Sequence, residues 1–195
     1  MEEIKEGYTR VSEIVGWFKA NELAKIDPDT LRKKAHLGTN VHAAIAGYDE
    51  GIYVPLDEKE MGYFESFKIW KSENSGPLMG TEQRFYCDEL MITGAVDCIT
   101  CDTKNGRGTI LDFKTTIKED PIGWPLQAAF YHYLASKNGF LLNDEASFIQ
   151  LQKDGTRPVA YTYGMSKKLK KNMIMCYETY KLWHLTKKEV VSKLY

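Results

Sequence analysis

Two strand-like segments joined by an Asn-Gly turn constrain the fold of this chain more than any other feature. The apolar runs at 91–101 and 108–116 flank Asn105-Gly106. Asn-Gly between two such runs strongly indicates a β-hairpin. Each run carries an aspartate where an apolar strand residue is expected, Asp97 in the first and Asp112 in the second. A hairpin would bring the two carboxylates together within a sheet.

The second run also carries a lysine close to its aspartate, in Leu111-Asp112-Phe113-Lys114. Successive side chains of a strand point to opposite faces, so Asp112 and Lys114 share one face and Phe113 takes the other. Carboxylate oxygens bind hard divalent cations, and a lysine can stabilise a developing anion or orient a water molecule. The pattern suits metal-assisted hydrolysis of a phosphodiester.

Other interpretations of the same residues stay open at this level. An edge strand often carries charges that discourage edge-to-edge pairing, and a lone Asp-x-Lys is a weak motif. The two aspartates could form a structural calcium site, although that would leave Lys114 without a role. A fold that only binds nucleic acid or a protein partner is disfavoured, because clustered acids that bind nothing repel one another.

Flanking segments add polar residues in a definite order. A predicted helix over 38–45 carries His42, and a predicted helix that starts near Trp124 carries Gln127 and Tyr131, four residues apart and therefore on one helix face. Glu82 stands in the strand-like run before Gly94-x-x-Asp97. The order is His, Gly-x-x-Asp, Asp-x-Lys and Gln-x-x-x-Tyr.

With these motifs, residues from about Tyr8 to Tyr133 resemble the PD-(D/E)xK nuclease superfamily. The resemblance is to the branch that includes the RecB nuclease domain, the CRISPR-adaptation nucleases, and the mitochondrial and phage exonucleases. It implies an α/β fold with a restriction-endonuclease-like mixed central sheet flanked by helices. Predicted strands at 81–88, 91–101, 108–116, 146–152 and 158–163, with helices around them, agree with that fold.

The resemblance also implies roles for these residues around one or two Mg²⁺ or Mn²⁺ ions. The metal ligands would be His42, Asp97, Asp112 and the main-chain carbonyl of Phe113. Lys114 would orient the water and stabilise the transition state. Glu82 would join the metal ligands or hold Lys114. Gln127 and Tyr131 would lie beside the active centre and touch the substrate strand.

The expected activity is that of a metal-dependent deoxyribonuclease, and the branch favours an exonuclease acting on DNA ends in replication, recombination or repair. A structure-specific endonuclease and a catalytically silent binding module are the alternatives. Since the sequence has no ATP-binding P-loop, a helicase or recombination protein would be a separate partner. Polarity, strand preference, DNA versus RNA and oligomeric state are not encoded in any recognisable motif.

Some relatives in this branch hold an iron–sulfur cluster with one cysteine before the histidine motif and three after the tyrosine motif. Here no cysteine precedes Cys87, and only Cys176 follows Tyr131. Cys98-x-x-Cys101 lies on a predicted strand, where residues three apart face opposite sides. We therefore expect no iron–sulfur cluster.

The chain of 195 residues with 43% hydrophobic content is long enough for one compact domain, so we expect a single nuclease domain over 1–195. Its net charge is −1, but residues 150–195 hold 10 Lys and Arg against 3 acids. A predicted C-terminal helix at about 166–192 begins with four clustered lysines, which are candidates for contacting DNA phosphates: Lys167, Lys168, Lys170 and Lys171. A solvated helix face is the alternative role for these lysines.

The chain has no apolar run of about 18 residues, the minimum for a membrane-spanning helix, and its acidic start does not resemble a targeting peptide. We expect a cytoplasmic protein, in a bacterial or phage-infected cell. The sequence also predicts two local features of the helices. Asp57 and Glu60 form a capping-box pattern, and the helix that follows Asp27-Pro28 is expected to be interrupted near Gly38.

Overall fold

A mixed β-sheet forms the centre of the protein in the computed structural model, which describes residues 4–48, 50–74, 76, 78–102 and 104–192. Six strands in this described part are connected in the order β1-β3-β4-β5-β6, and β2 pairs with β3 outside this path. The β1–β3 and β4–β5 pairs are parallel and the others antiparallel. The expected α/β fold with a mixed central sheet is confirmed.

The strands are β1 (Thr9–Arg10), β2 (Leu78–Cys87), β3 (Ile92–Asp102), β4 (Arg107–Lys114), β5 (Leu142–Gln150) and β6 (Val159–Gly164). The helices are α1 (Val11–Trp17), α2 (Ala20–Leu23), α3 (Pro28–Tyr48), α4 (Glu58–Glu73), α5 (Gly123–Lys137) and α6 (Lys167–Ser192). The predicted hairpin of β3 and β4 is present, and Gly106 in its connection has φ 67°, a backbone conformation that favours glycine.

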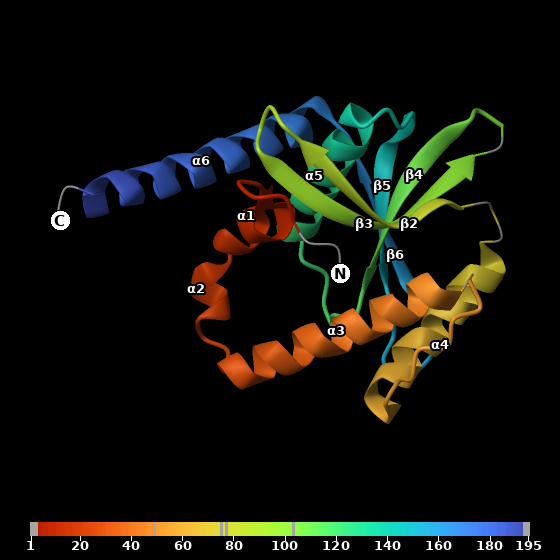
Figure 1. Ribbon diagram of the computed structural model, residues 1–195. Helices are drawn as coiled ribbons and strands as arrows, with labels where there is room; N and C mark the ends of the chain where they lie inside the picture. Colours follow the sequence, from red (N-terminus) through yellow and green to blue (C-terminus); the bar gives the residue numbers. More distant parts are fainter. Residues whose placement is uncertain (1–3, 49, 75, 77, 103, 193–195) are drawn as a thin grey trace.

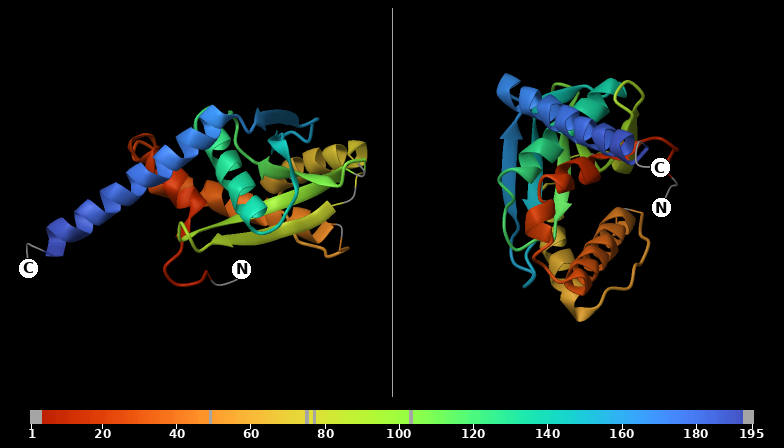
Figure 2. Two further views of the ribbon diagram at one scale, coloured as in Figure 1. Left: turned by 90° about the horizontal axis from the view of Figure 1, so that it is seen from above. Right: turned by 90° about the vertical axis from the view of Figure 1, so that its left-hand side faces the viewer.

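Helices cover both faces of the sheet, as Figures 1 and 2 show. One core cluster joins α1, α5 and α6 to strand residues that include Ile110 and Phe148. The other joins α3 and α4 to the neighbouring strand residues, including Leu111 and Ile149. Because neighbours on a strand point to opposite faces, α3 and α4 lie on one face and α1, α5 and α6 on the other.

The sheet opens between β3 and β4. Antiparallel pairing between them ends at Cys98 and Leu111. The other edge of β3 is occupied by β2 along its length, and β1 pairs with Ile92 and Thr93 on the same edge as β4. Within the described part of the chain, the segment of β3 between those two partners therefore has no neighbouring strand on that edge. Asp97 lies in this segment, and Asp112 lies just past the last β3–β4 pair.

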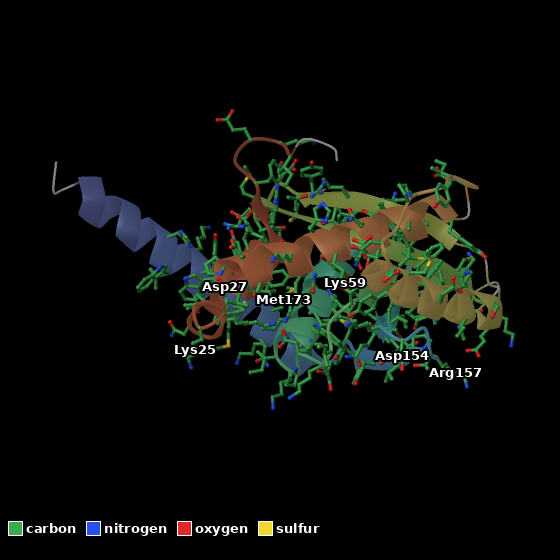
Figure 3. The ribbon with its side chains drawn as sticks, turned by 90° about the horizontal axis from the view of Figure 1, so that it is seen from below. Lys25, Asp27, Lys59, Asp154, Arg157 and Met173 are labelled. Carbon is green, nitrogen blue, oxygen red and sulfur yellow. The ribbon has the colours of Figure 1, made fainter. Side chains whose placement is uncertain are left out.

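The local helix predictions had different outcomes. The capping box is confirmed, since Asp57 accepts hydrogen bonds from the first turn of α4 while the Glu60 side chain accepts one from the Asp57 backbone amide. Lys25 and Asp27, labelled in Figure 3, mark the turn into α3, where Asp27 Oδ2 accepts a hydrogen bond from Thr30 N at 2.8 Å. The expected interruption at Gly38 is wrong, because α3 is continuous through it.

Packing explains the continuity at Gly38. A glycine in a helix interior costs only about 1 kcal/mol relative to alanine, and burial of the following turns outweighs that cost. Val41, Ala44 and Ile45 of the same helix are all buried. A Cβ built on Gly38 would lie 3.4 Å from Thr115 Oγ1, so this position of α3 faces the end of β4.

The C-terminal helix α6 packs on α1 and α5 through its first half. Met173, Cys176 and Tyr177 are buried there, and Tyr177 Oη donates a hydrogen bond to the carbonyl of Leu90. Its second half extends away from the sheet (Figure 2). Trp183 in this second half is 56% exposed. Among the described residues, no helix is both long and apolar enough to cross a membrane.

Candidate active site

Asp97 occupies the gap where β3 and β4 separate. Its Oδ2 accepts a hydrogen bond from the backbone N–H of Phe113 at 2.7 Å, and its Oδ1 lies 2.9 Å from Nδ1 of His42. The carboxylate thus takes the place of the strand pair that would follow Cys98 and Leu111. Since His42 belongs to α3, this contact connects the sheet to α3.

The side chains before and after Asp97 on β3 point to opposite faces of the sheet. Val96 packs in the cluster on the α5 face, whereas Cys98 packs in the cluster on the α3 face. Residues two apart on a regular strand would share a face, so the alternation is broken at this position. Groups from both faces of the sheet can therefore meet at the gap.

Glu82 lies across from Asp97 on β2. Pairing passes from Thr81 with Cys98 to Gln83 with Val96 and skips Glu82, whose φ of 49° is uncommon for a residue other than glycine. Ligand atoms of His42, Glu82 and Asp97 all lie within 4.8 Å of one another. An imidazole and two carboxylates at this spacing fit a divalent cation with mixed nitrogen and oxygen ligands.

Asp112 belongs to a second chain of contacts on the α5 side. Its Oδ2 lies 2.5 Å from Lys114 Nζ, as the shared strand face predicts. Lys114 Nζ donates to Gln127 Oε1 at 3.0 Å, and Gln127 Nε2 donates to Tyr131 Oη at 2.7 Å. Helix α5 thus brings the predicted Gln127 and Tyr131 to the acids. Asp112 itself is outside the three-residue group of His42, Glu82 and Asp97.

Two aromatic rings, those of Phe148 and Tyr131, make further contacts in this second chain. The Lys114 ammonium lies 4.8 Å from the centre of the Phe148 ring, a contact that no sequence pattern indicates, because Phe148 resembles any buried strand residue. Gly94 faces the ring of Tyr131, and a Cβ at Gly94 would come within 2.8 Å of Tyr131 Cε1. The glycine of the Gly-x-x-Asp motif thus leaves room for the tyrosine of α5.

The pKa values of the two aspartates are shifted in opposite directions. Burial alone would raise the pKa of Asp97, but His42, Lys114 and the Phe113 N–H stabilise its anion and lower the pKa below the ordinary value. Burial raises the pKa of Asp112 to about 6, against the opposing effect of Lys114. Neighbouring carboxylates whose pKa values are pushed apart are common at catalytic centres.

The pKa values of His42 and Glu82 are shifted as well. Burial disfavours the charged imidazole, but the Asp97 carboxylate outweighs it and raises the pKa of His42 to about 9. Burial raises the pKa of Glu82, and the charge of Asp97 adds to the increase. Tyr131 stays protonated, since burial raises its pKa well above the ordinary value. In the protein without metal, the site thus holds a charged His42–Asp97 pair.

The four clustered lysines of α6 are not brought to these acids. All four are exposed. Lys170 Nζ lies 3.4 Å from Asp144 Oδ1 near the start of β5, whereas Gln150, which pairs with Lys114, ends that strand. Asp144 and Gln150 are six positions apart along β5, a distance of roughly 20 Å.

None of the four cysteines belongs to the described cluster of His42, Glu82 and Asp97. Cys87, Cys98 and Cys176 are buried, and Cys101 is partly exposed. His132 is buried and shares a 3.0 Å hydrogen bond with the Asn143 carbonyl.

The α/β fold and its mixed central sheet are consistent with the restriction-endonuclease-like fold. The family model of the PD-(D/E)XK nuclease superfamily matches residues 56–191, and the chain belongs to this superfamily. His42 precedes the matched region, so its place in the site rests on its contacts with Asp97 and Glu82.

Structural comparison agrees with the fold. The crystal structure of SSO0001 is similar over 93% of this chain and 79% of that chain, with a TM-score of 0.50 and 14% sequence identity. At this identity the similarity concerns the fold alone. No curated protein matches the sequence significantly.

Proposed function

We propose that residues 1–195 form one divalent-metal-dependent nuclease domain that hydrolyses DNA phosphodiester bonds, acting on DNA ends as an exonuclease. Membership of the PD-(D/E)XK nuclease superfamily supports the reaction class. The observation that carries the proposal is the convergence of two chains of contacts on the gap between β3 and β4. One links His42 to Asp97, and the other links Asp112 to Lys114 and Gln127.

The ligand set suits Mg²⁺ or Mn²⁺. His42, Glu82 and Asp97 would hold the ion, joined by Asp112 and the Phe113 carbonyl. A bound divalent cation supplies charge that neutralises the phosphoryl group and activates water. The lowered pKa of Asp97 keeps it an anion at neutral pH, which suits it to hold a cation.

Lys114 is the group that we assign to the reacting phosphate. Its side chain is only 17% exposed and its ammonium is held by Asp112 and Gln127, so its position is defined before substrate arrives. A preorganised cation in a partly dry site stabilises the negative charge that develops in the transition state. Asp112 and Gln127 orient this cation, and Tyr131 orients Gln127.

Exonuclease action is inferred from the resemblance to the RecB-like and phage-exonuclease branch. The α6 lysines would contact phosphates away from the reacting bond. Lys170 lies beside Asp144 near the start of β5, whereas Lys114 pairs with Gln150 at the end of that strand. A helicase or recombination protein would be a separate partner.

The proposal is tested by a degradation assay with Mg²⁺ or Mn²⁺ on linear duplex, end-labelled single strands and closed circles. Asp112→Ala is the inactive variant and Asp144→Ala the matched control, because the Asp144 side chain is 86% exposed at the far end of β5. Degradation of linear DNA alone, lost only in Asp112→Ala, supports an exonuclease at this site. Cleavage of circles indicates an endonuclease, and no metal-dependent cleavage refutes the proposed activity and favours a binding module.

A further inference from the structure

An exposed isoleucine stands on the segment that leaves the proposed catalytic strand. Residues 115–122 connect β4 to α5, and Ile117, three residues after Lys114, is 81% exposed. Single exposed apolar residues are common on protein surfaces and need no explanation by themselves. The surroundings of Ile117, however, are unusually well fixed for a surface loop.

Hydrogen bonds hold the backbone on both sides of Ile117. The buried amide of Gln150 donates to the Thr116 carbonyl at 2.8 Å, and Thr116 Oγ1 donates to the Lys118 carbonyl at 3.3 Å. Tyr163 Oη donates to Glu119 Oε1 at 2.9 Å. The connection is thus tied to β5 and β6, while the Ile117 side chain projects into solvent. An apolar group held in this way loses little conformational entropy when it inserts into a ligand.

The connection also borders the candidate active site. Thr115 faces Gly38, and Gly38 lies on the same face of α3 as His42, one turn away. In Figure 1 the connection is the thin green segment that passes beside α3 before α5 begins. Three residues span at most about 10 Å, so Ile117 lies within roughly three base steps of a phosphate held at Lys114.

We propose that Ile117 is a wedge that inserts beside the terminal base pair of a DNA duplex and unstacks it, so that one strand can reach Lys114. Apolar side chains such as isoleucine, inserted between base steps, unstack DNA in this way. The adjacent Lys118 is exposed and would contact a phosphate of the parted strand. This inference rests on the proposed nuclease function and specifies paired DNA ends as a substrate class.

The test compares Ile117→Ser with wild type on three substrates of one sequence: a single strand, a blunt duplex, and a duplex whose end has three unpaired nucleotides. Cleavage of the blunt duplex should fall about 10-fold, whereas cleavage of the other two should stay within twofold. The matched control is Ile122→Ser, in the same connection and 67% exposed, which should leave all three rates unchanged.

A second readout does not depend on turnover. In the Asp112→Ala background, a fluorescent adenine analogue in the terminal base pair should brighten when saturating protein binds, and Ile117→Ser should remove the increase. Equal loss on all three substrates, or an unchanged blunt-duplex rate, would overturn the wedge while leaving the nuclease proposal standing. A wild-type protein that cleaves single strands but no paired end would also overturn it. Absence of all metal-dependent cleavage by wild type would instead refute the proposed function on which the wedge depends.

Discussion

The backbone amide of Phe113 donates a 2.7 Å hydrogen bond to the Asp97 carboxylate, so a side chain of β3 replaces the missing strand pair between β3 and β4. The same carboxylate meets His42 from α3. Asp97 therefore bridges β3 and β4, pairs with a charged imidazole and faces Glu82 in the candidate metal site. Asp97 thus stabilises the sheet and is also a proposed metal ligand, and two substitutions can distinguish these roles.

Asp97→Ala should destabilise the metal-free protein by about 2–4 kcal/mol, because it leaves the Phe113 amide and the His42 charge without their partner. Asp97→Asn keeps a carbonyl oxygen that can accept the hydrogen bond of the Phe113 amide. Its loss of unfolding free energy should therefore be about half as large or less. Urea denaturation in a chelator measures both. Calorimetric titration should find Mn²⁺ binding weakened at least 10-fold in both variants. Equal stability of the two variants would contradict the role of Asp97 in the sheet.

Gly94→Ala should destabilise the protein by about 1–3 kcal/mol, since the new methyl group would approach Tyr131 Cε1 at 2.8 Å and neither helix α5 nor β3 can move freely. A smaller residue at the partner position should relieve the clash. The double variant with Tyr131→Leu should therefore lose less stability than the sum of the single variants. Additive losses in this double-mutant cycle would show that Gly94 and Tyr131 are not coupled.

His42 should make the stability of the metal-free protein depend on pH. Its pKa is about 9 in the folded chain against an ordinary 6.5, so its contribution is fully present below pH 6.5 and is lost as pH rises through 9. The contribution is on the order of 1–3 kcal/mol, allowing for solvent screening of a side chain that is 26% exposed. Chelator-treated wild type and His42→Asn should therefore converge in unfolding free energy between pH 6.5 and 9. A constant difference would contradict the charged pair.

Lys114→Ala should retain Mn²⁺ binding and lose cleavage by at least about 100-fold, because the lysine stabilises charge in the transition state without being a metal ligand. The matched variant Lys104→Ala changes an exposed lysine in the turn between β3 and β4 and should cleave single strands normally. Calorimetry and single-turnover kinetics measure the two properties. Loss of Mn²⁺ binding in Lys114→Ala would mean that the lysine shapes the metal site.

Mn²⁺ should raise the melting temperature of the wild type, since a ligand that binds only the folded state stabilises it. Glu82→Gln should reduce the increase, because Glu82 lies in the three-residue cluster. Glu89→Gln serves as control, since the Glu89 side chain is 67% exposed and pairs with Lys137 outside the cluster. An identical increase in wild type and Glu82→Gln would remove Glu82 from the set of metal ligands.

Features with a local physical cause were predictable from the sequence. Alternation along β4 placed Asp112 and Lys114 together and buried Phe113, and helix spacing placed Gln127 within reach of Tyr131. The capping box at Asp57 was equally visible. Each depends on residues a few positions apart, whose geometry follows from the strand or helix itself.

Features that depend on distant packing were not predictable. The continuity of α3 through Gly38 follows from burial of the next turns, and the position of Phe148 under Lys114 follows from the parallel pairing of β5 with β4. The basic cluster of α6 was visible as a charge pattern, but only packing on α1 and α5 places Lys170 at the far end of β5 from Gln150.

The sequence by itself determined which polar groups are available, in what order, and which of them share a strand or helix face. Only the tertiary structure decided that β3 and β4 separate at Asp97, that Glu82 takes a left-handed backbone conformation beside it, and that the two aspartates differ in pKa. The physical reason is that separation of strands, burial and charge interaction depend on groups brought together from several elements. Local alternation contains no information about them.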